Sequence, residues 1–252
     1  MISTISSKLI SILKAIIPIL LLFGAWQLVA IIINDEFFVP TIPTTLGVLK
    51  DLLKQGEFYI NVSYSLMRVV AGLLIGSSIG FALAILSYKI KYAEKILTPF
   101  FSVVKATPIA SIILVFYVQF TNNVFSIIIA CLMATPIIWQ NVLDAFKSIP
   151  AELSELCDAY EFPALKRFRI LTLPALLRYF IPAFITCSGL CWKASVSAEI
   201  IVYNIKSIGK YINDAGWSDT PTVFACTLVM IILSILLEKI IKLLLGRCEK
   251  WL

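Results

Sequence analysis

The sequence contains no histidine among its 252 residues, and only 14% of its residues are charged. Histidine is the commonest metal ligand and general base, so its absence argues against a metal centre and against most hydrolytic sites. No G-x-x-x-x-G-K-[ST] motif is present, so the chain has no phosphate loop with which to hold ATP. The six cysteines form no C-x-x-C pair and four lie in apolar segments, which indicates small buried residues rather than ligands or disulfides.

The composition is instead dominated by hydrophobic residues, at 60% of the chain, with a mean hydropathy of +0.96. Soluble domains are about 45–50% apolar and about 25% charged, so this is a membrane protein. A helix of about 20 apolar residues crosses a bilayer, and segments of that length recur along the chain. The expected fold class is an all-α membrane protein, one transmembrane domain over residues 1–252, with six spans at about 15–33, 64–86, 99–120, 124–143, 176–201 and 222–245.

Lysine and arginine are distributed unevenly between the two sides of these spans. Fourteen of the 21 lie on the side of the termini, four lie on the other side, and Arg68, Lys105 and Lys193 lie within spans. Basic residues are enriched in cytoplasmic loops, so both termini are predicted to be cytoplasmic. This placement accounts for the net charge of +6 without a nucleic-acid partner. No small-residue cleavage site follows the first apolar run, which is therefore expected to be an uncleaved span.

Two connecting segments have patterns of their own. In residues 39–58, Pro40 and Pro43 are expected to interrupt any helix, and Thr44 or Thr45 to cap a short amphipathic helix along the membrane surface. Residues 87–95 are predicted to be a basic loop, and residues 121–123 a tight turn.

Three glycines in the second span recur every fourth residue. This spacing places them on one helix face, where a neighbouring helix can approach closely. We interpret them as helix-packing residues: Gly72, Gly76 and Gly80.

The longest charged interruption covers residues 150–174, and we call it the coupling segment after the role that its resemblance to a known family, given next, implies. Pro150 can open a helix whose acids suit the positive end of the helix dipole, and Pro163 favours the start of a second helix. The segment is predicted to form two short helices outside the bilayer, joined near Glu161. The first helix has an apolar face that needs a groove on a partner: Leu153, Leu156, Ala159 and Tyr160.

This segment resembles the EAA loop of ABC-importer permeases, in which an acid-led helix is followed by glycine and by a helix ending in an aliphatic residue, leucine and proline. Counting back from Leu173–Pro174, the motif glutamate falls on Glu155, and the two alanines become Leu156 and Cys157. Glu161 stands where the motif has glycine. It must therefore adopt a left-handed turn at a cost of about 1 kcal/mol, or the turn takes another form.

Three more stretches are similar to motifs of nitrate/sulfonate/taurine-type permeases, so that the resemblance covers roughly residues 39–215. They are SYSLMRVVAGLLIGSSIGFALAI, LTPFFSVVKATPIASIILVFY and CWKASVSAEIIVYNIKSIGKYINDA. The resemblance implies a type I importer fold in the bacterial cytoplasmic membrane. It also implies a second permease chain, expected to form a homodimer, two ATPase subunits that hold ATP and magnesium, and an extracytoplasmic binding protein. The chain itself is expected to be no enzyme and to carry no cofactor or metal.

The resemblance also assigns roles to individual residues. Those expected to couple the chain to the ATPase are Glu152, Glu155, Leu156, Asp158, Tyr160, Glu161 and Pro163.

Charged residues inside spans are candidates for the translocation path or its gate, because a buried charge usually faces protein or water. Lys193 is expected to line the path or to pair with a neighbouring span. Glu199 is six residues further on and faces another direction, so it is a gate residue, a docking contact or a solvated helix end. Arg68 either snorkels to the interface or has an internal partner, and Lys105 is a further candidate.

Two other classes of function remain open: an ATP-independent secondary transporter or channel, and a membrane scaffold. The solute also remains open among sulfonates, nitrate, taurine and vitamin precursors, with Lys193 favouring an anion.

Overall fold

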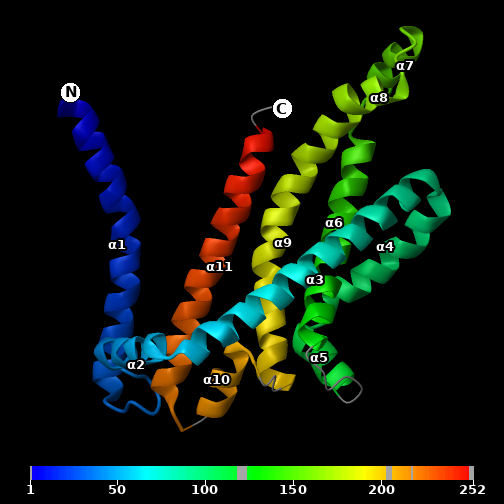
Figure 1. Ribbon diagram of the computed structural model, residues 1–252. Helices are drawn as coiled ribbons and strands as arrows, with labels where there is room; N and C mark the ends of the chain where they lie inside the picture. The colour runs from blue at the N-terminus through cyan, green and yellow to red at the C-terminus, as the bar shows by residue number, and fades with distance from the viewer. Residues whose placement is uncertain (1, 118–123, 203–205, 217, 250–252) are drawn as a thin grey trace. The chain divides into compact units, whose positions relative to one another are not determined.

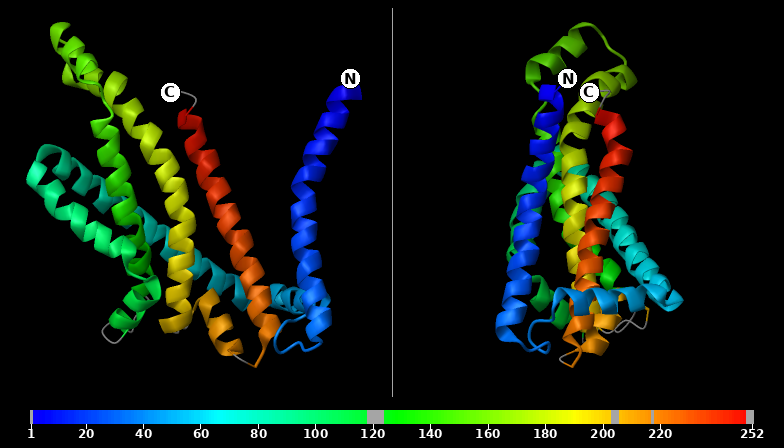
Figure 2. Two further views of the ribbon diagram at one scale, coloured as in Figure 1. Left: turned by 180° about the vertical axis from the view of Figure 1, so that it is seen from behind. Right: turned by 90° about the vertical axis from the view of Figure 1, so that its left-hand side faces the viewer.

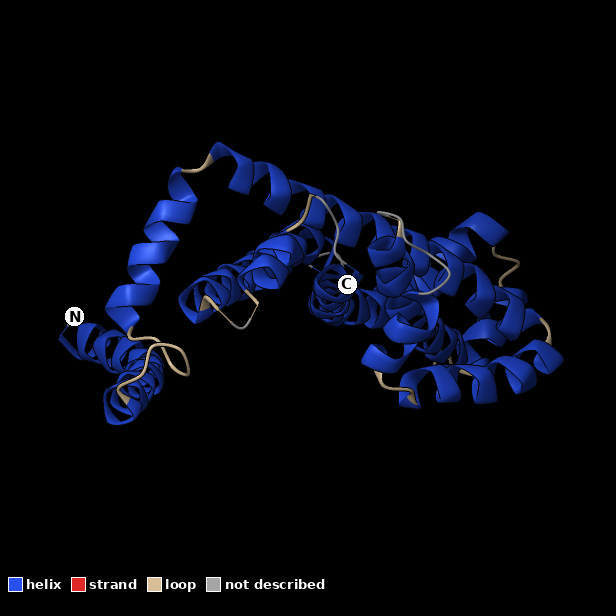
Figure 3. Ribbon diagram, turned by 90° about the horizontal axis from the view of Figure 1, so that it is seen from below, coloured by secondary structure: helices blue, strands red, loops and turns tan. Residues whose placement is uncertain are grey.

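Every regular element in the described part of the chain is helical, which confirms the all-α prediction there (Figure 3). The computed structural model describes residues 2–117, 124–202, 206–216 and 218–249. A π-helical turn, η1 (Phe168–Thr172), joins α8 to α9. The α-helices labelled in Figure 1 are α1 (Ile2–Ile33), α2 (Ile42–Lys54), α3 (Gly56–Lys89), α4 (Lys91–Ala106), α5 (Ile109–Tyr117), α6 (Phe125–Lys147), α7 (Ala151–Ala159), α8 (Ala164–Arg167), α9 (Leu173–Val202), α10 (Ile208–Ala215) and α11 (Thr220–Glu249).

Three helical stretches of the described residues are long and apolar enough to cross a membrane: Gly56–Lys89, Phe125–Lys147 and Ala164–Val202. The pair α4 and α5 would make a fourth span, although the two helices are bent by 93° at the break between them. A shorter apolar helix runs over Ile17–Ile33. A multi-pass membrane protein is thus supported with three or four candidate spans, and the count of six stays a prediction.

The third span, expected to be continuous over residues 99–120, is broken. Thr107 has the extended conformation (φ −74°, ψ 129°) that a residue before proline favours, so α4 ends there and α5 begins after Pro108. The predicted basic loop over residues 87–95 was also wrong, because only Ile90 separates α3 from α4. The tight turn expected at residues 121–123 lies outside the described residues.

The contacts between Cα atoms divide the chain into two units, Met1–Tyr59 with Tyr211–Val229, and Ile60–Lys210 with Met230–Leu252. In the first unit, Trp26 Nε1 donates to the carbonyl of Pro40 at 3.0 Å, and Gln27 Oε1 accepts from the backbone of Ile42 at 2.9 Å. These bonds attach the start of α2 to α1.

The cap of α2 differs from the prediction of Thr44 or Thr45. Thr41 is the N-cap, and its hydroxyl accepts from the Thr44 backbone N–H at 3.4 Å. Pro43 does not interrupt the helix, because it occupies the first turn, where its missing N–H has no intrahelical partner to lose.

In the second unit, α3 lies against α6 through a glycine face. A Cβ added at any of the three positions would lie 2.6 Å from a carbonyl oxygen of α6. Trp139 of α6 also donates from Nε1 to the buried hydroxyl of Ser87 on α3 at 2.9 Å. The backbones therefore approach too closely for any side chain at Gly72, Gly76 or Gly80.

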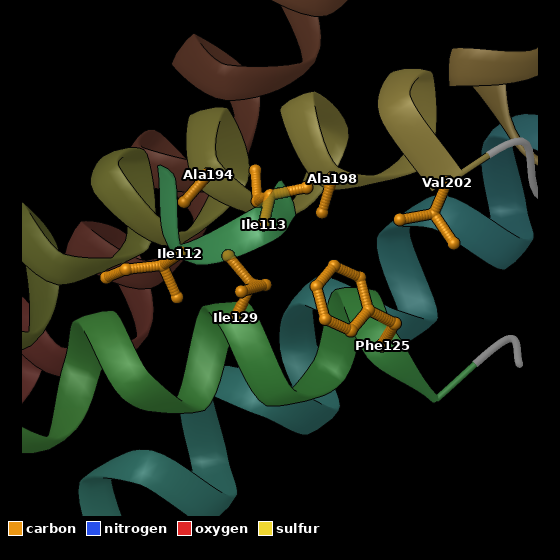
Figure 4. Close-up of a cluster of buried hydrophobic side chains, with 7 residues drawn as sticks. All are labelled: Ile112, Ile113, Phe125, Ile129, Ala194, Ala198 and Val202. Atoms are coloured by element: carbon orange, nitrogen blue, oxygen red, sulfur yellow. The ribbon is translucent and has the colours of Figure 1, made fainter. Parts of the chain in front are cut away.

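A buried hydrophobic cluster packs α5 and α6 against α9 in the same unit (Figure 4). Phe125 and Ile129 of α6 point toward α5 and α9, where Ile113 lies beside Ala194 and Ala198, and these small alanines allow the helices to come close. This packing and the glycine face hold together the helices that carry the segment between α6 and α9.

Candidate functional site

The coupling segment joins α6 to α9 at one end of that helix pair, as both views of Figure 2 show. Pro150 is the N-cap of α7, and Glu152 lies in the first turn, where a carboxylate suits the helix dipole. Pro163 is the N-cap of α8. One expectation was wrong: the second helix is not separate, because α8 continues through η1 into α9 as one helical stretch over Ala164–Val202.

The turn between α7 and α8 is made by Glu161 in the left-handed conformation, with φ of 47°. The Phe162 N–H donates to the Cys157 carbonyl at 2.9 Å, and the Glu161 N–H donates to the Asp158 carbonyl at 3.0 Å. This pair of bonds is the Schellman motif, which closes a helix C-terminus and normally has glycine at the position of Glu161. The turn that ends α7 is therefore formed by glutamate at a position that usually needs glycine.

Replacing Glu161 with glycine is expected to stabilise the turn by about 0.5–1 kcal/mol. Glycine removes the left-handed penalty of about 1–2 kcal/mol, and it returns part of that gain because the unfolded chain becomes more flexible. Hydrogen exchange of the Phe162 N–H in detergent measures the change, with slower exchange expected. The matched control is Glu155→Gly inside α7, which should destabilise the helix by about 1 kcal/mol. Faster exchange in Glu161→Gly would contradict this account.

Arg167 of α8 holds the turn from the other side. Its Nη1 donates to Asp158 Oδ1 at 2.6 Å, and its Nη2 donates to the Ser154 hydroxyl. The Lys166 ammonium lies 3.9 Å from the centroid of the Phe162 ring. An exposed ion pair adds at most about 1 kcal/mol, so Arg167 supplements the turn hydrogen bonds in joining α8 to α7.

The surface of α7 presents apolar and acidic side chains together. Leu156 is 53% exposed, and Tyr160, which caps the end of α7, is 69% exposed. The remaining predicted coupling residues are all exposed beside them: Glu152, Glu155, Asp158, Glu161 and Pro163. Leu153 lines a pocket of about 330 Å³ between α7 and the start of α9, with Arg178 at its wall. The arrangement can bind a partner whose groove is apolar with a basic rim.

The charged residues predicted for the translocation path fall into two groups. Lys193 on α9 and Lys105 on α4 are exposed in the single chain. Arg68 and Glu199 are brought together: Arg68 Nη1 lies 2.8 Å from Glu199 Oε1, with side chains 7% and 0% exposed. Glu199 is therefore not a solvated helix end, and Arg68 has an internal partner.

Sequence reasoning missed two residues of this buried cluster. Ser65 donates to Glu199 Oε2 at 2.6 Å, and Gly209 lies so close that an added Cβ would be 2.7 Å from Glu199 Cβ. Both residues stand in the two stretches that carry the resemblance stated above, three positions before Arg68 and ten after Glu199. Their presence in those stretches was a signal, but nothing in either stretch indicated that they meet.

Comparison with known families decides the class of protein. The family described as "Binding-protein-dependent transport system inner membrane component" matches residues 72–250. The chain belongs to this family. The match includes the coupling segment, α9 and Glu199, whereas Ser65 and Arg68 precede it.

Individual relatives are about a quarter identical to this chain over the residues that align. A permease protein of Bacillus subtilis named for aliphatic sulfonates transport is 24% identical over 95% of this chain and 87% of its own length. A bicarbonate transport system permease protein of Synechococcus elongatus is 26% identical over 79% of this chain and 69% of its own. A nitrate import permease protein of Leptolyngbya laminosa is 28% identical over 64% of this chain and 57% of its own. The chain is thus a multi-pass permease component of the inner membrane.

Proposed function

We propose that this chain is the membrane permease of an ATP-driven importer and that the coupling segment is its contact with the ATPase. The observation that carries the proposal is the exposed apolar and acidic surface of α7, which ends in the Glu161 turn and is joined to α8 by Arg167. A surface of this kind on a segment between two spans needs a soluble partner. Since the sequence has no phosphate loop, ATP and magnesium belong to that partner.

In this proposal the chain crosses the membrane six times, with α1, the bent pair α4 and α5, and α11 added to the three clear spans. The excess of basic residues on the side of the termini supports a cytoplasmic location for both termini and for the coupling segment. Two copies of the chain bind two ATPase subunits, and an extracytoplasmic binding protein delivers the solute. ATP-driven closure of the ATPases then moves the two coupling segments toward each other and switches the accessible side.

The solute proposed is a small anion. Relatives are named for sulfonate, bicarbonate and nitrate transport, and these three solutes share a negative charge and oxygen acceptors. Lys193 is an exposed cation on the α9 span. An anionic solute would balance its charge, and without such a solute Lys193 would have to pair with another part of the complex. Lys193 is therefore the residue we place in the path.

Uptake into proteoliposomes tests the proposal. The chain, its ATPase and its binding protein are reconstituted together, and uptake of labelled sulfonate, nitrate and bicarbonate is measured with and without internal ATP. We expect uptake of one of these anions only with ATP, and we expect vanadate to reduce it to the ATP-free level. Equal uptake without ATP would show an ATP-independent transporter, and no uptake of any anion would remove the solute assignment.

A further inference from the structure

Arg68 and Glu199 lie at the centre of a hydrogen-bond network that joins three separate parts of the second unit. Arg68 Nη1 contacts Glu199 Oε1 on α9 and also donates to the carbonyl of Lys206 at 2.9 Å. Ser65 donates to Glu199 Oε2 and accepts from the backbone N–H of Ile208 at 3.0 Å. Ser65 and Arg68 of α3 therefore each contact both Glu199 of α9 and the backbone of the segment that follows α9.

The network is closed to water. Glu199 is completely buried and Arg68 is 6% exposed, so neither side chain faces a path along which a solute would move in this structure. One cation and one anion balance each other, and every polar group named has a partner, which is the condition under which a buried ion pair is tolerated. Gly209 completes the packing, because an added Cβ would lie 2.8 Å from the Glu199 backbone carbonyl carbon.

We propose that Ser65, Arg68, Glu199 and Gly209 form a latch that holds residues 206–209 against α3 and α9, so that these three parts move as one body during transport. These are positioning residues, and they are not contacts of the solute. If α9 moved along α3, Arg68 and Glu199 would be separated while both remained buried. This costs far more free energy than shifting the surrounding apolar contacts. This inference rests on the proposed transport function for its functional consequence, but the latch itself is a property of the isolated chain.

The energetic coupling is tested on the purified protein in detergent, without ATPase or solute. Arg68→Met and Glu199→Met each leave one buried charge without its partner, and each should lower Tm by roughly 10 °C. The double variant removes both charges and should be more stable than the sum of the two single losses predicts. The matched control is the exposed pair of α2, Asp51→Asn with Lys54→Met, whose side chains are 71% and 65% exposed and whose changes should be small and additive. Additive losses at Arg68 and Glu199 would overturn the latch.

The functional consequence is tested with Ser65→Ala, which keeps the ion pair and removes the bonds to Glu199 and Ile208. In the reconstituted importer we expect uptake per ATP hydrolysed to fall about tenfold while the rate of ATP hydrolysis is retained. Equal losses of uptake and hydrolysis, or wild-type uptake, would overturn the positioning role. If the wild-type complex shows no ATP-driven uptake, the proposed function fails, and the Tm cycle still decides whether the latch exists.

Discussion

Replacing Gly76 with alanine is expected to lower the free energy of unfolding by about 3 kcal/mol, the upper part of the range for inserting an atom into a close-packed contact. The added Cβ would lie 2.6 Å from the Cys131 carbonyl oxygen and 2.9 Å from its Cα, and neither atom can move without moving α6. Thr135 Oγ1 also donates to the Gly76 carbonyl at 3.3 Å, and separation of the helices would lengthen this bond. Thermal unfolding of the purified protein in one detergent measures the loss.

The matched control for this prediction is Gly47→Ala in α2. Gly47 also lies inside a helix, but no heavy atom is within 4 Å of its added Cβ. Alanine is the better helix former by about 1 kcal/mol, so this variant should be as stable as the wild type or more stable. A similar change in Tm for Gly76→Ala and Gly47→Ala would show that the close approach of α3 and α6 does not contribute to stability.

Hydropathy predicts the helices of this chain better than it predicts their ends. A bilayer requires about 20 apolar residues, so three spans were visible in the sequence. Those near 64–86 and 176–201 lie within α3 and α9, and that near 124–143 begins one residue before α6. The ends extend further, because polar and basic residues are good helix formers outside the apolar layer. The break at Pro108 could not be predicted from hydropathy. The proline is visible in the sequence, but the packing around it decides whether the span is kinked or divided.

The candidate site divides in the same way. The position of the turn near Glu161 was predicted from a local pattern, but the left-handed conformation of Glu161 was only one of two alternatives, and the structure decides for it. The pair of Arg68 and Glu199 was not reached, because these residues are 131 positions apart and helical periodicity reports only the face on which a residue lies. The spacing of Lys193 and Glu199 on one helix excludes Lys193 as the partner of Glu199, but it does not indicate that the partner lies on α3.

Replacing Leu156 with aspartate is expected to weaken binding of the ATPase by about 100-fold, or about 2.7 kcal/mol. Leu156 is 53% exposed on α7, so in the proposed complex it is free to enter a groove on the ATPase. Burial of a leucine side chain contributes about 1.5–3 kcal/mol, and an aspartate in its place leaves a charge without a partner in an apolar groove. The permease itself should unfold at the wild-type temperature, because the side chain is not part of its core.

Co-purification of the ATPase with the permease, followed over a series of ATPase concentrations, measures this loss. Leu46→Asp is the matched control, because Leu46 is 51% exposed on α2 and stands outside the coupling segment. Tyr160→Ala, on the same exposed surface of α7, should also weaken the complex, since a large aromatic side chain is a typical anchor of an interface. Wild-type affinity in both Leu156→Asp and Tyr160→Ala would exclude the α7 surface as the ATPase contact, whereas weaker binding in these two variants but not in Leu46→Asp would locate that contact at α7.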